Sequence, residues 1–157
     1  MKIDKTNTVR LLERAKIEYV LIPYVFDEND LSALHVATSL NEPIEQVFKT
    51  LVLKGDKTGY FVCVIPGNVE LDLKKSAKVS GNKNCDLIPL QALLPLTGYI
   101  RGGCSPIGMK KQFPTYIHET CSFHEHIFVS AGQRGLQMKI RTTDLIRIAN
   151  MTVAGIV

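Results

Sequence analysis

Two pairs of strand-like runs, each joined by a short glycine-containing turn, constrain the fold of this 157-residue chain more than any other feature. Residues 50–54 and 59–66 are rich in β-branched and aromatic residues and flank Gly55-Asp-Lys-Thr58. Residues 126–131 and 136–141 flank Gly132-Gln-Arg-Gly135 in the same way. Runs joined by so few residues pair antiparallel as hairpins, which strict strand–helix alternation would not contain. The sequence therefore predicts an α+β fold with a mixed, largely antiparallel sheet.

The rest of the chain alternates between strand and helix patterns. Further strands are predicted over residues 19–26, 99–101 and 115–118, and Pro23 places the first of them at an edge or a bulge. Apolar spacing and capping residues predict helices over residues 7–17, 32–40, a short one from 43, 72–79, 90–94 and 144–149. No repeat or linker interrupts this pattern, so residues 1–157 are predicted to form one domain.

The apolar pattern and the cysteines of the sequence indicate the compartment in which the protein acts. Residues 1–10 carry no apolar leader, and no apolar run is long enough to cross a bilayer, so we expect a cytoplasmic protein without a membrane partner. The cysteines have no paired spacing, which indicates reduced thiols.

The formal charge of +4 suits a polyanionic partner but does not require one. Lysines gather in two groups that could flank a site for a phosphate backbone or could simply be solvated: Lys74, Lys75, Lys78 and Lys83, and Lys110 and Lys111.

Gly98-Tyr-Ile-Arg-Gly-Gly-Cys-Ser-Pro-Ile-Gly108 holds four glycines in eleven residues, which no regular element favours. Gly102 and Gly103 could present bare N–H groups to an anion or a developing oxyanion, with Ser105 as a further donor. A glycine-rich turn that only reverses the chain is the alternative.

Lys49 stands between apolar residues at a helix-to-strand junction. Because lysine is rarely buried without a partner, its side chain either emerges into a cleft, where it would meet an oxygen ligand, or reaches to solvent.

Two other groups of reactive residues carry weaker signals. Cys104 could be a nucleophile with a histidine as base, but a cysteine in such a loop more often packs as a small apolar residue. A zinc site could be built from a second group, whose spacing matches no standard zinc signature: His118, Cys121, His124 and His126. We therefore expect no metal and no cofactor.

Four segments in this order resemble the YbaK/EbsC family of tRNA deacylases over essentially the whole chain. They are Phe48-Lys-Thr-Leu-Val52, Leu71-Asp-Leu-Lys-Lys75, the glycine-rich segment and Phe128-Val-Ser-Ala-Gly-Gln-Arg-Gly-Leu-Gln137. The resemblance implies a single editing domain whose mixed sheet curls towards a barrel, with helices outside and a small pocket for the aminoacyl end of tRNA. It also implies deacylation of cysteine mischarged to proline tRNA, and a possible association with prolyl-tRNA synthetase.

Carried over by position, the resemblance assigns catalytic roles to Lys49, Gly102 and Gly103. It places Tyr24, Ser130 and, in the region of a missing family phenylalanine, Leu31 or Ser32 near the substrate. Gln137 stands where some members have an aspartate, so a carboxylate role is not transferred. The implied chemistry needs no protein nucleophile, because the substrate's own thiol can attack its ester and leave as a thiolactone, a lyase-type reaction. Release of alanine from proline tRNA, and a tRNA-binding module without catalysis, remain alternatives.

Overall fold

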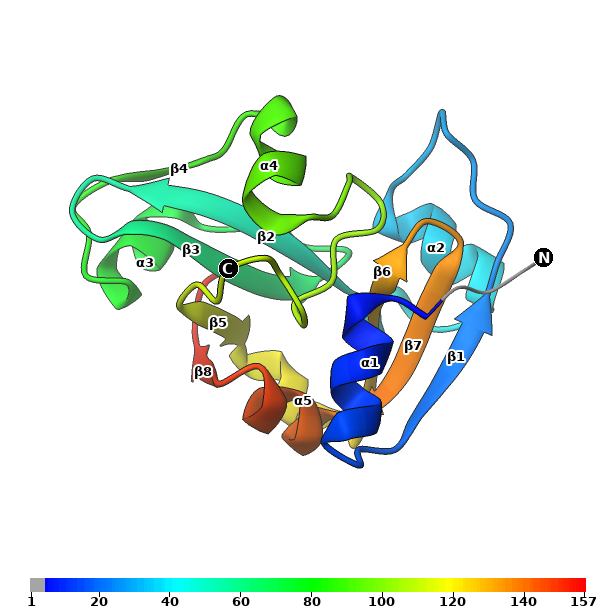
Figure 1. Ribbon diagram of the computed structural model, residues 1–157. Helices are drawn as coiled ribbons and strands as arrows, with labels where there is room; N and C mark the ends of the chain where they lie inside the picture. Colours follow the sequence, from blue (N-terminus) through cyan, green and yellow to red (C-terminus); the bar gives the residue numbers. More distant parts are fainter. Residues whose placement is uncertain (1–4) are drawn as a thin grey trace.

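The strands of the computed structural model form two sheets, and residues 5–157 are described (Figure 1). The first sheet is antiparallel, in the order β1 (Tyr19–Pro23), β7 (Leu136–Arg141) and β6 (His126–Gln133). The second sheet has the order β4 (Cys85–Leu87), β2 (Phe48–Gly55), β3 (Gly59–Pro66), β5 (Thr115–His118) and β8 (Met151–Ala154). Its first three strands are antiparallel, and β5 runs parallel to both β3 and β8. The predicted α+β class and the mixed, largely antiparallel pairing are confirmed.

The expectation of a barrel-like, curled sheet is wrong. Neither sheet closes: β4 and β8 end one sheet, and β1 and β6 end the other. Among residues 5–157, the backbone pairing that joins the two sheets is an isolated parallel bridge between Val47 and Phe128. Two residues beyond that bridge on each strand, Lys49 and Ser130 line a cavity instead of extending the ladder, so the hydrogen bonding that closure requires is interrupted there.

The helices begin and end close to the predicted positions. They are α1 (Asn7–Arg14), α2 (Ala33–Leu40), α3 (Leu73–Val79), α4 (Leu93–Thr97) and α5 (Thr142–Ile148), with short 3₁₀ turns η1 (Ile44–Gln46), η2 (Leu90–Ala92) and η3 (Glu119–Phe123). Ser32 and Asp72 cap α2 and α3 as their positions predict, by accepting hydrogen bonds from backbone N–H groups. Thr6 caps α1. Thr8 is buried, and its hydroxyl instead forms hydrogen bonds with the Tyr99 hydroxyl and the Ile107 carbonyl.

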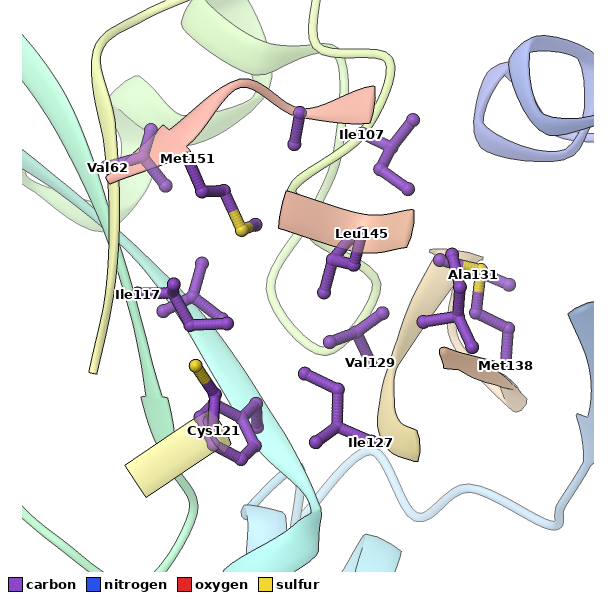
Figure 2. Packing of buried hydrophobic residues seen from close by; sticks show 14 of the residues in the cluster. Val62, Ile107, Ile117, Cys121, Ile127, Val129, Ala131, Met138, Leu145 and Met151 are labelled. Carbon is purple, nitrogen blue, oxygen red and sulfur yellow. The ribbon is translucent and has the colours of Figure 1, made fainter. Parts of the chain in front are cut away.

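A shared apolar core lies between the two sheets (Figure 2). Val62 and Ile117 enter it from the five-stranded sheet, Val129 and Met138 from the three-stranded sheet, and Leu145 from α5. This packing fixes the two sheets relative to each other and hence the bridge at which they meet.

Several segments differ from the sequence prediction. Residues 99–101 form no strand, because the Thr97 hydroxyl accepts from the Tyr99 N–H and the Tyr99 hydroxyl bonds the Ile107 carbonyl at 2.7 Å. The edge strands β4 and β8 were not predicted. The first helix ends at Arg14 rather than at residue 17, and Lys16 adopts a left-handed conformation with φ of 58°.

All four cysteines are unpaired. Among residues 5–157, no helix has the length and apolarity needed to cross a membrane.

Candidate active site

A cavity of about 370 Å³ opens where the two sheets diverge. Its walls come from α2 and the loop before it, the start of β2, residues 101–104, and the paired strands β6 and β7. The cavity brings together seven of the residues singled out from the sequence: Leu31, Ser32, Lys49, Gly102, Cys104, Ser130 and Gln137. Tyr24, Gly103 and Ser105 are not among its lining residues.

Lys49 reaches the cavity half-buried, as the cleft interpretation of its sequence position expects. Its ammonium makes one long contact, 3.5 Å from Nζ to the Gly67 carbonyl oxygen. Burial lowers the pKa of Lys49, and the nearby Glu70 carboxylate opposes that shift. The ammonium has therefore lost hydration without gaining a close partner, so an incoming ligand oxygen would stabilise it.

Gly67 explains how the chain comes so close to α2 at this point. A Cβ on Gly67 would lie 2.4 Å from the Ala33 side chain, and its N–H donates to the Val47 carbonyl at 2.8 Å. A larger residue here would separate the strand end from the helix and move the carbonyl that Lys49 contacts.

Ser130 and Gln137 face each other across β6 and β7, because they are register partners in the antiparallel pair. Both side chains therefore lie on one face of the sheet, the face that lines the cavity. The Gln137 Oε1 atom is buried and has no partner among the described residues. The same is true of the Thr50 hydroxyl, which also lines the cavity. Such buried, unpaired oxygens are costly unless a ligand bonds them.

Gly102 and Gly103 have different surroundings and so different roles. Gly102 lines the cavity with φ of 85°, and no acceptor for its N–H lies within the described chain. Gly103 turns its N–H to the Ile100 carbonyl at 2.9 Å, so this donor is already engaged. A Cβ on Gly103 would lie 2.9–3.0 Å from the backbone of Gln133 and Arg134, which makes Gly103 the point where the loop packs on the β6–β7 turn.

Two other loop residues have different surroundings from those expected. Ser105 is fully buried, and its hydroxyl accepts from the Ile107 N–H at 3.2 Å, so it serves its own turn. Cys104 lines the cavity, but burial raises the pKa of its thiol to about 12. A thiol with that pKa is almost entirely protonated near neutral pH and is a poor nucleophile.

Tyr24 is not in the cavity wall. It packs against the buried cluster that contains Val36 and Val47, and its N–H donates to the Gly135 carbonyl at 2.9 Å. Burial raises the pKa of Tyr24, and hydrogen bonding with the Gly135 backbone and the Gln137 amide opposes that shift. Tyr24 therefore interacts with the Gln137 amide without lining the cavity itself.

The candidate zinc residues do not gather. His118 Nδ1 accepts from the Ile156 N–H at 3.3 Å, and Cys121 is completely buried in the apolar core. Within the part of the chain that the structure describes, no group of three or more His, Cys, Asp or Glu side chains is placed to hold a metal ion.

Sequence reasoning missed three features of the cavity. Thr50 follows Lys49 directly, and strict strand alternation would put the two side chains on opposite faces, so the sequence carried no sign that both line the cavity. Gly67 and Arg101 gave no signal either, because their place in the wall depends on contacts between distant segments.

Comparison with known proteins agrees with this geometry. Residues 27–148 match the model of the aminoacyl-tRNA editing domain, so the chain belongs to that family. A protein of Enterococcus faecalis, EbsC, is named as a candidate Cys-tRNA(Pro)/Cys-tRNA(Cys) deacylase. It is 50% identical over 153 residues, which cover 98% of this chain and 93% of the relative.

Two further similarities support more limited conclusions. A proline–tRNA ligase of Thermosipho africanus is 30% identical over 87 residues, which cover 55% of this chain but 15% of the ligase. The crystal structure of a candidate trans-editing enzyme for prolyl-tRNA synthetase superposes with a TM-score of 0.82 at 22% identity, covering 96% of this chain and 94% of that one. The second match establishes the shared fold.

Proposed function

We propose that this protein is a cytoplasmic trans-editing deacylase that removes mischarged cysteine from proline tRNA. The observation that carries the proposal is the half-buried Lys49 ammonium, with one long carbonyl contact, in a cavity that also holds the unengaged Gly102 N–H. Both groups suit an ester carbonyl that gains negative charge. The 50% identity to EbsC over nearly the whole chain supports the same substrate. The partial match to a proline–tRNA ligase supports action alongside the synthetase that makes the error.

The reaction we propose is intramolecular. The thiol sulfur of the attached cysteine forms a bond to the ester carbonyl carbon, and the carbon–oxygen bond to the ribose of the terminal adenosine breaks. The thiol proton ends on the released ribose oxygen, and the products are a thiolactone and uncharged tRNA. No water is consumed in this step, so it is formally a lyase reaction.

The protein's part in this step is to position the ester and to stabilise charge. Lys49 and the Gly102 N–H would face the carbonyl oxygen as it becomes an oxyanion, and preorganised donors of this kind are typically worth about a hundredfold or more in rate. Ser130, Gln137 and Leu31 would hold the aminoacyl group against the opposite wall. Gly103, Ser105 and Tyr24 would fix the loop and the amide that line the cavity.

Cysteine is favoured over alanine because the thiol in the cavity wall, Cys104, is unsuited to act as a nucleophile. The Cys104 thiol is protonated, as its pKa of about 12 indicates. An alanyl ester would need an attacking water, whereas a cysteinyl ester carries a nucleophile that is held three covalent bonds from the carbonyl carbon.

The test combines a change in the enzyme with a change in the substrate under single-turnover conditions, which isolate chemistry from product release. Cys104→Ala should keep most of the activity on cysteinyl-tRNA(Pro). Seryl-tRNA(Pro), which differs by sulfur to oxygen, should be released far more slowly by the unmodified enzyme, because a hydroxyl is ionised much less than a thiol. Abolition of release by Cys104→Ala, together with equal release of serine and cysteine, would overturn the proposal. RNA binding without release of cysteine, serine or alanine would favour a tRNA-binding module.

A further inference from the structure

A second groove adjoins the mouth of the cavity. It is lined by leucines and an isoleucine from η2, α4 and the loop that follows, together with two arginines and one glutamate: Glu28, Leu31, Leu90, Leu93, Leu94, Ile100, Arg101 and Arg134. Leu31 and Arg101 also line the cavity, so the groove and the cavity share part of one wall.

Apolar side chains in this groove are unusually open to solvent. Leu90 and Leu94 are 59% and 50% exposed, and Ile100 is 43% exposed. Together they form one apolar surface along the groove. Gathered apolar exposure of this kind marks a place where another molecule binds.

The fold fixes the position of the Arg134 side chain in this groove. Arg134 lies in the β6–β7 turn, and its Nε–H donates to the Arg101 carbonyl at 2.8 Å. The aliphatic part of the same side chain lies 3.4 Å from the position of a Cβ on Gly102. One nitrogen of the guanidinium is thus anchored beside the cavity loop, while its two terminal nitrogens make no hydrogen bond within residues 5–157 and can meet a ligand. With Arg101 added and Glu28 subtracted, the lining carries one net positive charge.

The proposed reaction determines which part of the tRNA lies beside the cavity. When the aminoacyl group occupies the cavity, the terminal adenosine is at its mouth, and the preceding nucleotides of the single-stranded 3′ end leave along the adjoining surface. That strand offers a phosphate at each step and a base face between steps, which matches anchored guanidinium groups set beside an apolar surface.

Building on the proposed function, we infer that this groove binds the single-stranded CCA end of the tRNA. Arg134 and Arg101 hold the phosphate that precedes the terminal adenosine, and the groove of Leu90, Leu94 and Ile100 receives the base before it. Arg134 is accordingly a positioning residue for the ester and makes no contact with the reacting atoms.

Two substrates that differ by this phosphate provide the test. One is the cysteinyl ester of adenosine, and the other is the trinucleotide CCA with cysteine on its terminal adenosine. Arg134→Gln should lower kcat/KM about tenfold on the trinucleotide and leave the adenosine ester unchanged, because only the former presents the phosphate. Arg147→Gln, which removes an exposed arginine from α5, is the matched control and should change neither. Equal loss on both substrates would mean that Arg134 acts through the loop alone, and no loss on either would remove it from the site; both results overturn the inference.

Binding of uncharged CCA-ended RNA separates this inference from the proposed deacylation. Arg134→Gln should reduce the slope of log affinity against log salt by about 0.7, the value for one contact to a single strand. Leu94→Gln should weaken binding with the slope unchanged. Unaltered affinity and slope in both variants would refute the groove. Failure of the unmodified enzyme to release cysteine, with the slope change present, would refute only the deacylase proposal.

Discussion

Replacing Lys49 by methionine should separate catalysis from stability. Methionine keeps most of the length of the side chain and its apolar contacts but removes the ammonium. Lys54→Met is the matched control, since Lys54 lies on the same strand with an exposed side chain over the Tyr60 ring.

The size of the effect follows from the surroundings of Lys49. A unit charge about 4 Å from a developing oxyanion contributes about 4 kcal/mol at the effective dielectric of about 20 that suits a half-buried group. Removal of one preorganised donor typically costs about 2.7–4 kcal/mol. The long 3.5 Å contact with Gly67 leaves the ammonium free to move towards the oxygen, and solvent screens part of the interaction. We therefore expect the lower end, a loss of about a hundredfold in the single-turnover rate.

Stability should change in the opposite direction. The pKa of Lys49 is lower in the folded chain than its ordinary value, so the protonated side chain decreases the free energy of unfolding at pH values below the folded pKa. This penalty fades as the pH rises through the folded and then the unfolded pKa. Lys49→Met removes it, and the melting temperature near neutral pH should stay the same or rise.

Rapid-quench deacylation of cysteinyl-tRNA(Pro), with thermal unfolding of the same samples, measures both quantities. Normal activity in folded Lys49→Met would remove Lys49 from the site. A comparable loss in Lys54→Met would show that the effect is long-range charge, and a marked fall in melting temperature would show that the lysine is structural.

Two further predictions concern residues outside the catalytic wall. Alanine at His124 and His126, and incubation with a chelator, should leave deacylation unchanged; stoichiometric zinc by elemental analysis together with loss of activity on chelation would contradict this. Gly103→Ala should lower the melting temperature by several degrees, because its Cβ would lie 2.9–3.0 Å from the backbone at Gln133 and Arg134, and overpacking costs about 1–3 kcal/mol; unchanged unfolding with full activity would show that the loop relaxes without cost.

Local signals in the sequence predicted most elements of the fold. The hairpin at Gly55–Gly59, the caps at Ser32 and Asp72, and the edge position of β1 are determined by residues close together in the chain. Pairings between distant segments were not accessible in this way. The short strands β4 and β8 become strands only through neighbours contributed by β2 and β5, and the failure of the sheets to close depends on where β2 and β6 diverge.

In the site, too, some features follow from local sequence and others only from contacts between distant segments. The sequence position of Lys49 left two possibilities, a cleft or solvent, and the structure places the side chain in the cavity wall. The roles of Gly102 and Gly103 could not be separated from sequence, because adjacent glycines look alike until the β6–β7 turn packs on one of them. The unpaired oxygens of Thr50 and Gln137 likewise become apparent only when β2 and β7 face the same cavity.

The charge of the cavity connects Gln137 to the choice of substrate. Lys49 and Arg101 line the cavity, and no Asp or Glu is among its lining residues. An aspartate at position 137 would add a negative charge opposite Lys49, whereas the amide leaves the local potential positive. A positive potential lowers the pKa of a bound thiol and so increases its thiolate fraction, while it adds nothing to the reactivity of a methyl group. Under the proposed mechanism, the amide at Gln137 therefore suits a cavity that draws its nucleophile from the substrate, and cysteine would be selected by reactivity among amino acids small enough to enter.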